Sequence, residues 1–327
     1  MKPDEVIKSV TESTKGRQSH MVQYKAFQWL FFFYFYCFCG WCFESAYVSL
    51  KSGKPVNRGF MRGPFLPLYG SGAIMMLIVS MPFRDNILLT YIAGVIGATV
   101  LEYVTGVTME TLFKMRYWDY SDRPFNFQGQ ICLRSSVAWG FLTILMTKVV
   151  HKPVEQFVLM IPEGALFWVT MVLTLYIVAD FTLSFKAAME LRDILVKMQK
   201  LKEEIERLQR RLDVIIAFSN ADKGQKRQES ELSLAELILG VKQRFASLKE
   251  IIQSRPSAYG EGIREEIAEL RGRFVQYSEV QRGYREMLGF YKRDMIRNNP
   301  MMVSRKFRNA MEELKHIVSG EQREEEE

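Results

Sequence analysis

Histidine and cysteine are scarce in this sequence, with 3 His and 4 Cys among 327 residues. Three of the cysteines, Cys37, Cys39 and Cys42, lie close together, and the fourth is Cys132. Helical residues two apart point away from each other, and no histidine accompanies the group, so it lacks the spacing of a metal site. We therefore expect reduced, buried, structural cysteines, no bound metal and no cofactor.

A strong excess of one charge is also lacking. Residues 1–185 contain 16 Lys or Arg and 12 Asp or Glu, and residues 186–327 contain 28 and 25. This modest basic excess does not call for nucleic acid as a partner, and loops beside anionic lipids explain it better. A cleavable signal peptide is not expected, because the first apolar run follows a charged stretch and no small-residue cleavage site comes after it.

Long apolar runs, by contrast, dominate the first half of the chain. Their length suits a hydrocarbon core about 30 Å thick, crossed at about 1.5 Å per helical residue. We predict a polar N-terminal tail at 1–25 and a transmembrane domain at 26–185, with a turn at His151-Lys152-Pro153 before the last span. The five expected spans are 26–50, 65–82, 86–113, 127–147 and 157–185.

The remaining residues, 186–327, are predicted to form a soluble helical domain that ends in an acidic tail. Its first helix continues from the fifth span without a breaker and carries apolar residues at spacings of three and four, typical of a coiled-coil or helical-hairpin seam. The seam residues are Leu191, Ile194, Met198, Leu201, Ile205, Leu208, Leu212 and Ile215. Two further amphipathic helices are expected, from about Ser233 to Gln253 and from about Gly262 to Asn298.

These apolar stripes could pack on one another as an antiparallel bundle or on a second subunit, and the sequence favours neither. The predicted fold class is all-α: a polytopic membrane helical bundle of about five spans, followed by a cytosolic coiled-coil or helical-hairpin domain.

Loop charges predict which side of the membrane each end occupies. With five spans, the first and third connecting loops share a side with the C-terminal domain and hold seven Lys or Arg, against three in the opposite loops. The positive-inside rule therefore predicts a multi-pass cell-membrane protein with a cytoplasmic C-terminal domain. The N-terminal tail, which has five Lys or Arg of its own, argues the other way.

Ionisable residues inside spans are costly and are functional candidates by default. Glu44 and Glu110 lie near the ends of the first and third spans and Arg134 near the start of the fourth, so all three should lie toward the C-terminal-domain face. A carboxylate and a guanidinium at similar depth can neutralise each other. Glu102 is further in and is the deepest expected charge.

A weak internal repeat groups some of these positions. Gly40, Glu44 and Gly63 recur as Gly106, Glu110 and Gly129, with a constant offset of 66 residues. We interpret this as two copies of a helical hairpin in the same orientation, which would place two glutamates pseudo-symmetrically around a polar site. Three matched positions could also arise by chance.

Two loop segments are the remaining binding candidates. The stretch from Asn57 to Pro64 places Arg58 and Arg62 among glycines, so we expect a flexible backbone with exposed N–H donors for a phosphate or carboxylate. The alternative is a simple turn with positive-inside residues. In Trp118-Asp119-Tyr120, Asp119 is expected to pair with Arg58 or Arg62, the alternative being an interfacial aromatic anchor.

Several of these motifs together resemble a bacterial membrane family, the ABC-transporter type IV or CmpB-like permease family, over about residues 27–150. The motifs are Gly40-Trp41-x2-Glu44, Asn57-Arg58-Gly59-Phe60-x2-Gly63-Pro64-x2-Pro67-Leu68-Tyr69-Gly70, Glu102-Tyr103, Met109-Glu110-x2-Phe113, Trp118-Asp119-Tyr120-Ser121 and Asn126-x2-Gly129-x-Ile131-Cys132-Leu133. The resemblance implies a permease. These 327 residues contain no Walker A motif, so any ATPase would be a separate polypeptide.

The leading hypothesis is thus a permease-like transporter subunit, not itself an enzyme, in a lipid bilayer. Its helical domain would bind an ATPase or other subunit, or form a homo-oligomer through the coiled coil. The expected substrate-binding residues are Glu44, Arg58, Arg62, Glu102, Glu110, Asp119 and Arg134. Two alternatives remain open: a membrane-embedded enzyme acting on a lipid headgroup, and a scaffold or sensor that signals through the coiled coil.

Overall fold

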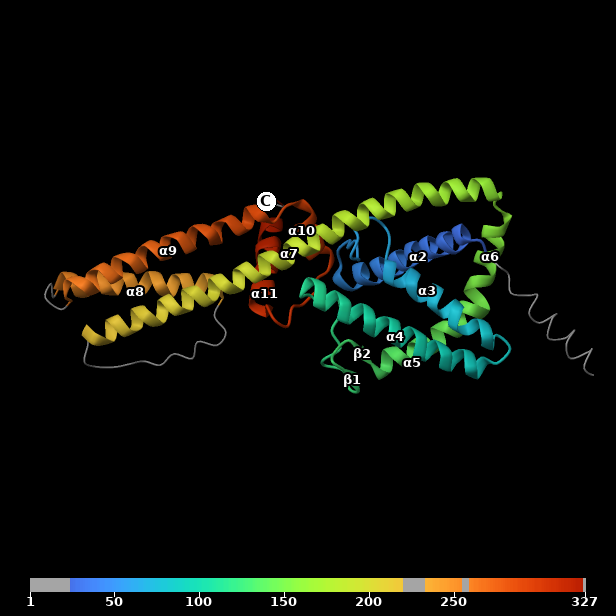
Figure 1. Cartoon of the computed structure of the whole chain (residues 1–327), viewed down its shortest axis with the longest axis horizontal. Helices are drawn as coiled ribbons and strands as arrows, with labels where there is room; N and C mark the ends of the chain where they lie inside the picture. Colours follow the sequence, from blue (N-terminus) through green and yellow to red (C-terminus); the bar gives the residue numbers. More distant parts are fainter. Residues whose placement is uncertain (1–23, 220–232, 255–258, 326–327) are drawn as a thin grey trace, which may run out of the picture.

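The computed structural model describes residues 24–219, 233–254 and 259–325, and the described chain is almost entirely helical (Figure 1). This confirms the all-α prediction. Most of the N-terminal tail, the polar linker after the first long soluble helix, the break around Pro256 and the last residues of the acidic tail lie outside the described residues.

The first half consists of helices that run back and forth between two ends of a bundle (Figure 1). In chain order they are α2 Ala26–Ser52, α3 Pro67–Ser80 with the 3-10 turn η1 Met81–Phe83, α4 Ile87–Phe113, α5 Leu133–Leu145, the π-helical segment η2 Met146–Val150, α6 His151–Met160 and α7 Glu163–Ser219. Helix α2 packs on α3, α4 packs on α5, and the start of α7 packs on α2 and α4.

Four helices are long and apolar enough to cross a membrane. They are Ala26–Ser52, Ile87–Phe113, Leu133–Met160 and the first part of Glu163–Ala217, and the segment Pro67–Phe83 is a shorter apolar helix. Large apolar side chains point outward from these helices, Leu50 being 85% exposed and Leu175 75%. Such an apolar surface is costly in water and suits a lipid environment, where helices satisfy their own backbone hydrogen bonds.

Small residues fill the contacts inside this bundle. At Gly40, a Cβ atom would overlap Tyr69 of α3, and at Gly94 one would overlap Thr143 of α5. Thr90, Thr143 and Ser80 are themselves fully buried. Close approach of helix backbones through glycine and small hydroxyl residues is the usual packing mode where lipid replaces water.

The structure differs from the sequence prediction around the fourth span. Residues expected to begin that span instead form a hairpin, β1 Asn126–Phe127 paired antiparallel with β2 Ile131–Cys132, and the helix starts at Leu133. Gly129 and Gln128 have positive φ values of 69° and 54°, as a tight turn requires. The turn is marked in the sequence by Gln128-Gly129-Gln130, which the prediction counted as part of the span.

The turn predicted at His151-Lys152-Pro153 is also wrong, because the helix continues there as α6. Pro153 lies just after the π-helical segment η2, and such a local change of the helix accommodates a proline that lacks an N–H. The chain reverses at Ile161-Pro162, since the residue before a proline favours an extended backbone, and Ile161 has ψ of 131°. In Figure 1, α6 lies across the end of the bundle that is distant from the C-terminal domain.

Two of the four cysteines contradict the expectation of burial. Cys37 and Cys132 are buried, whereas Cys39 and Cys42 are exposed on the outer face of α2, and all four are free thiols. The helical rotation of about 100° per residue explains this split, because it turns the latter pair away from the bundle.

The C-terminal half is built on the continuation of α7, which runs unbroken for 57 residues. Helices α8 Leu234–Ser254 and α9 Glu261–Met287 pack on it, and α10 Phe290–Asn298 and α11 Arg308–Glu325 return to its middle (Figure 1). All eight heptad residues of α7 are buried against helices of the same chain. Within the described residues, the seam is thus occupied as an intramolecular bundle.

The hydrophobic core of this half extends into the membrane half. Phe113, Met115 and Tyr117, at and after the end of α4, belong to the same buried cluster as the heptad residues and Met302. An isolated bridge between Arg116 and Val303 adds backbone hydrogen bonds in both directions. The two halves therefore share one core where they meet.

Candidate functional site

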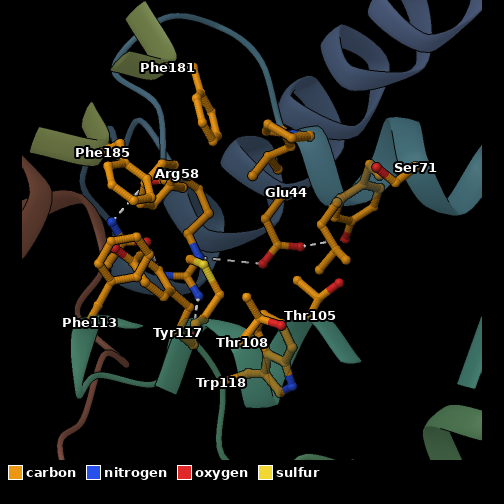
Figure 2. Close-up of a pocket in the computed structure, with 18 of the residues that line it drawn as sticks. Glu44, Arg58, Ser71, Thr105, Thr108, Phe113, Tyr117, Trp118, Phe181 and Phe185 are labelled. Carbon is orange, nitrogen blue, oxygen red and sulfur yellow. Dashed lines mark hydrogen bonds and ion pairs between the residues drawn. The ribbon is translucent and has the colours of Figure 1, made fainter. Parts of the chain in front are cut away.

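Glu44 and Arg58, two of the predicted site residues, meet at the end of the bundle that faces the C-terminal domain. Glu44 lies near the end of α2, and Arg58 lies in the loop that follows. Their Oε1 and Nε atoms are 3.5 Å apart, and the hydroxyl of Tyr69 on α3 donates to the other carboxylate oxygen at 2.8 Å (Figure 2). Within the first helical hairpin, Glu44 is thus fixed by the Arg58 guanidinium group and the Tyr69 hydroxyl.

The Arg58 side chain also contacts the C-terminal segment and the loop after α4. Its Nη1 donates to Asn299 Oδ1 at 2.9 Å, and its Nη2 donates to the Tyr117 carbonyl at 3.1 Å. Its backbone N–H donates to Ser45 Oγ. Arg58 is only 8% exposed, so these partners compensate for taking a guanidinium group out of water.

Glu110 is held in a comparable way in the second hairpin. Arg116, in the loop after α4, contacts its Oε2 atom at 2.5 Å, and Gln130 donates to the same oxygen at 2.6 Å. Arg116 also donates to the Gln128 carbonyl. Gly106 lies against Gln130, as Gly40 lies against Tyr69. Each hairpin thus pairs a glutamate with an arginine from its own loop, although the arginines do not follow the 66-residue offset.

Asp119 does not pair with Arg58 or Arg62, as the sequence suggested. Its Oδ1 atom lies 3.3 Å from Arg116 Nη1 and 3.9 Å from Arg305 Nη2. Burial opposes the charged form, but hydrogen bonds from Ser121 and the two arginine charges outweigh it and hold the pKa of Asp119 below its usual value. Asp119 is therefore ionised at neutral pH and links the loop to the C-terminal segment.

Glu102 is the most deeply placed carboxylate of the predicted set, only 4% exposed. It accepts hydrogen bonds from Tyr120 at 3.1 Å, Ser135 at 3.2 Å and Trp139 Nε1 at 2.9 Å. No cation lies within ion-pair distance of it in the described part of the chain. Neutral donors alone thus surround a carboxyl group inside a membrane-type helix.

Tyr120 connects this carboxyl group to the Glu44 cluster. Burial raises its pKa, and the charge of Glu102, its hydrogen bond to Glu102 and the charge of Glu44 raise it further. Tyr120 stays protonated and can donate to Glu102. The polar groups of α2, α3, α4 and α5 therefore form one neighbourhood around this loop.

Arg62 and Arg134 do not join these carboxylates. Arg62 pairs with Asp294 at 3.4 Å and lies over the rings of Phe290 and Tyr291 on α10, so it binds the C-terminal domain. Arg134 is exposed at the start of α5 and makes no ion pair with Glu44 or Glu110 in the described residues. The hairpin before α5 delays the helix start to Leu133, so Arg134 lies in the first turn of that helix.

The loop from Asn57 to Pro64 is not the flexible, exposed element that its glycines suggested. Asn57 accepts from Trp41 Nε1 at 2.5 Å and donates to the Arg62 carbonyl at 2.6 Å. The Gly63 N–H donates to Asp180 on α7 at 2.9 Å. These bonds occupy the Gly63 N–H and the Asn57 amide, so these two groups are already paired within the protein.

The C-terminal residues at this site were missed by sequence reasoning. Asn299 is 1% exposed and, besides accepting from Arg58, donates to the Gly59 carbonyl at 2.9 Å. Ser304 donates to the Lys114 carbonyl at 2.5 Å. The only sequence signal was Asn298-Asn299-Pro300, which was interpreted as the end of a helix.

Two cavities meet at Arg58. One, of about 310 Å³, lies between α3, α4 and α7 and is lined mainly by apolar side chains (Figure 2). The other, of about 840 Å³, lies between the loop after α4 and the segment Met301–Lys315, and charged side chains line it. Groups of three or more metal-binding side chains are absent from the described residues.

Comparison with known proteins finds a similarity between the membrane half and one described family. Residues 31–185 match the sequence model of the family described as "Putative ABC-transporter type IV". The match covers just under half of the chain and confirms the resemblance seen in the motifs. No curated protein and no solved structure matches the chain.

Proposed function

We propose that the chain is a permease-like subunit of a membrane transporter, with its substrate site at the charged end of the bundle. The observation that carries this proposal is the buried contact of Arg58 with Glu44 and Asn299, beside a cavity between membrane-type helices. Charged groups in such a position are expensive, and binding a polar substrate is a reason to retain them.

The proposed substrate-binding residues are Glu44, Arg58, Glu102, Glu110 and Asp119. Arg62 and Arg134 are left out, because the first binds α10 and the second is exposed and pairs with neither Glu44 nor Glu110 in the described residues. The chain is proposed to position and release its substrate without changing it covalently.

Five membrane crossings and a cytoplasmic C-terminal domain complete the proposal. The shorter helix Pro67–Phe83 would be the fifth crossing, and the alternation of helix directions in Figure 1 supports this count. The loops rich in Lys and Arg lie at the end of the bundle that meets the C-terminal domain, as the positive-inside rule requires of a cytoplasmic face.

The proposed partner is a separate ATPase or another subunit, docked on the C-terminal domain. Because α8 and α9 already cover the heptad seam of α7, a homo-oligomer through the coiled-coil region would need a different surface of this domain. Affinity purification of the full chain from membranes, followed by mass spectrometry, would identify such a subunit.

A loss-of-function test centres on Glu44→Gln, which removes the charge but keeps the size of the side chain. We expect cells with this variant to accumulate or lose the same small molecules as cells lacking the protein, measured by untargeted metabolite profiling. Glu163→Gln is the matched control, because Glu163 pairs with Lys25 at the opposite end of the bundle.

Equal membrane levels of the two variants must accompany this comparison. A wild-type metabolite profile in cells with a normally inserted Glu44→Gln variant would contradict the transport proposal.

A scaffold or sensor is the second candidate, favoured by one observation. The C-terminal segment contacts both loops of the membrane half, through Asn299 to Gly59 and through Val303 to Arg116. If the acidic residues prove dispensable while the C-terminal domain is essential, this candidate replaces the transporter.

A further inference from the structure

We infer that the site binds a membrane amphiphile, a single-chain lipid with an anionic head such as a phosphate. The inference rests on the proposed function in taking this end of the bundle as a substrate site, and it names the substrate class. It comes from the two cavities and from the residues that they share.

The smaller cavity has the character of an acyl-chain site. Phe60, Phe113, Phe181 and Phe185 line it, together with Thr105, Thr108, Met109 and Leu112. Figure 2 shows Phe181 and Phe185 across the cavity from Thr105 and Thr108. Its volume of about 310 Å³ lies at the lower end of the range for ligand pockets, about 300–1,000 Å³. The α4 and α7 walls belong to helices that are long and apolar enough to cross a membrane, so an acyl chain would meet apolar side chains there.

The larger cavity has the character of a headgroup site. Five of its lining residues are basic: Arg58, Arg123, Arg305, Arg308 and Lys315. Four are acidic: Glu44, Asp119, Asp122 and Glu312. It is enclosed by the loop after α4 and by the start of α11, outside the apolar part of the bundle.

Existing ion pairs leave this cavity with unmatched positive charge. Glu44 pairs with Arg58, Asp119 with Arg305, and Glu312 with Arg308. Arg123 and Lys315 have no carboxylate within ion-pair distance in the described residues, although Lys315 donates to the Pro300 carbonyl at 2.7 Å. Asp122 is the one remaining acid of the lining, so the cavity has one more basic than acidic side chain. A negatively charged head therefore suits this cavity, because guanidinium groups bind phosphate by two-point hydrogen bonds.

The two cavities share one wall, which makes a single ligand the simplest occupant. Glu44, Arg58, Tyr117 and Trp118 line both of them. A free anion would leave the apolar cavity unfilled, and a purely apolar molecule would cover charged groups without pairing them, which is costly. An amphiphile would fill both cavities at once. Its charged head would lie in the polar cavity between Arg58 and the C-terminal segment, and its chain would lie in the apolar cavity along α4.

Three defined probes separate the contributions of chain and head. The purified full-length protein in mild detergent is titrated with three probes. Oleoyl lysophosphatidic acid has both an acyl chain and a phosphate, glycerol 3-phosphate has the phosphate alone, and monoolein has the chain alone. We expect lysophosphatidic acid to bind at least about tenfold more tightly than either other probe, since each part contributes separately.

Two pairs of variants test the two cavities. Thr105→Phe fills the apolar cavity, and its control is Thr182→Phe on the exposed face of α7. Arg123→Gln removes a cation from the polar cavity, and its control is Arg273→Gln on α9. We expect each site variant to weaken binding of lysophosphatidic acid about tenfold and each control to leave it unchanged.

Arg123 is exposed on a loop, so its variant stays informative even if Thr105→Phe fails to fold. Equal binding of glycerol 3-phosphate and lysophosphatidic acid would overturn the inference in favour of a soluble anion. Equal binding of monoolein would overturn the anionic head, and binding of none of the probes would overturn the inference altogether. In each case the metabolite test of Glu44→Gln would still decide whether the chain is a transporter.

Discussion

Arg58 and Asn299 form a buried hydrogen bond between the two halves of the chain. The asparagine accepts one hydrogen bond from the guanidinium group and donates others to the Gly59 and Met295 carbonyls. All of these groups are buried, so losing the asparagine leaves several polar atoms without partners.

We predict that Asn299→Ala lowers the unfolding free energy by about 1–3 kcal/mol, the cost of leaving buried hydrogen-bonding groups unpaired. Thermal unfolding of the purified protein in detergent measures this as a drop of several degrees in Tm. The adjacent Asn298 is only partly buried and makes none of these contacts, so Asn298→Ala should leave Tm nearly unchanged. Equal Tm values for the two variants would show that the contact does not hold the halves together.

At this scale the sequence identified the charged members of the site but not their partners. Glu44 and Arg58 could be predicted because charge inside or beside an apolar run is conspicuous. Asn299 could not, because it reaches Arg58 across 241 residues and an asparagine beside a proline is common at helix ends. Arg134 lies near the start of its helix as expected, but Glu44 and Glu110 pair with arginines of their own loops instead.

Helix α4 packs on α5 through a glycine that admits no side chain. A Cβ atom at Gly94 would overlap Thr143 at its Cβ, which moves only with its backbone, and Thr143 is fully buried. The separation of these two helices, and with it the position of Glu102 relative to Trp139, is therefore set in part by this contact.

We predict that Gly94→Ala destabilises the protein by about 1–3 kcal/mol, the usual cost of overpacking a tight contact. The control is Gly72→Ala in α3, where a Cβ would meet nothing within 4 Å. There, alanine should be neutral or stabilising by up to about 1 kcal/mol, because it favours the helix. Thermal unfolding in detergent compares the two, and a stable Gly94→Ala variant would mean that α5 can move away without loss.

At the scale of elements, the sequence predicted the long helices well and their ends less well. Apolar runs mark α2 and α4 because helices in contact with lipid must be apolar on most of their surface. The absence of a breaker after the fifth expected span correctly predicted that α7 continues into the charged half. Pro153 and the hairpin before α5 were misjudged, since a proline's effect depends on the local form of the helix around it.

The distribution of charge over the whole molecule is asymmetric. The loops with most basic residues lie at the same end of the bundle as the C-terminal domain. Lys54 and Lys152 are exposed lysines near opposite ends of the bundle and make a matched pair for labelling. Cys39 and Cys42 are also exposed, so they are first replaced by alanine.

We predict that a membrane-impermeant maleimide labels Lys152→Cys in intact cells and labels Lys54→Cys only after the cells are permeabilised. This outcome follows from the positive-inside rule applied to opposite ends of the bundle, with Lys54 in the loop after α2 and Lys152 in the first turn of α6. Total labelling in detergent serves as the control for reactivity. The reverse pattern would place the C-terminal domain outside the cytoplasm, and labelling of both residues in intact cells would contradict the five-crossing arrangement.

Helix α7 has a mechanical consequence. With 57 residues at about 1.5 Å each, it is about 85 Å long and belongs to both halves without a joint. A tilt of its membrane end by about 5° would swing the far tip by about 7 Å if the helix stayed straight. Such a helix is a lever arm: a small rearrangement around Phe181 and Phe185, where α7 borders the apolar cavity, would be magnified at the far end of the C-terminal bundle.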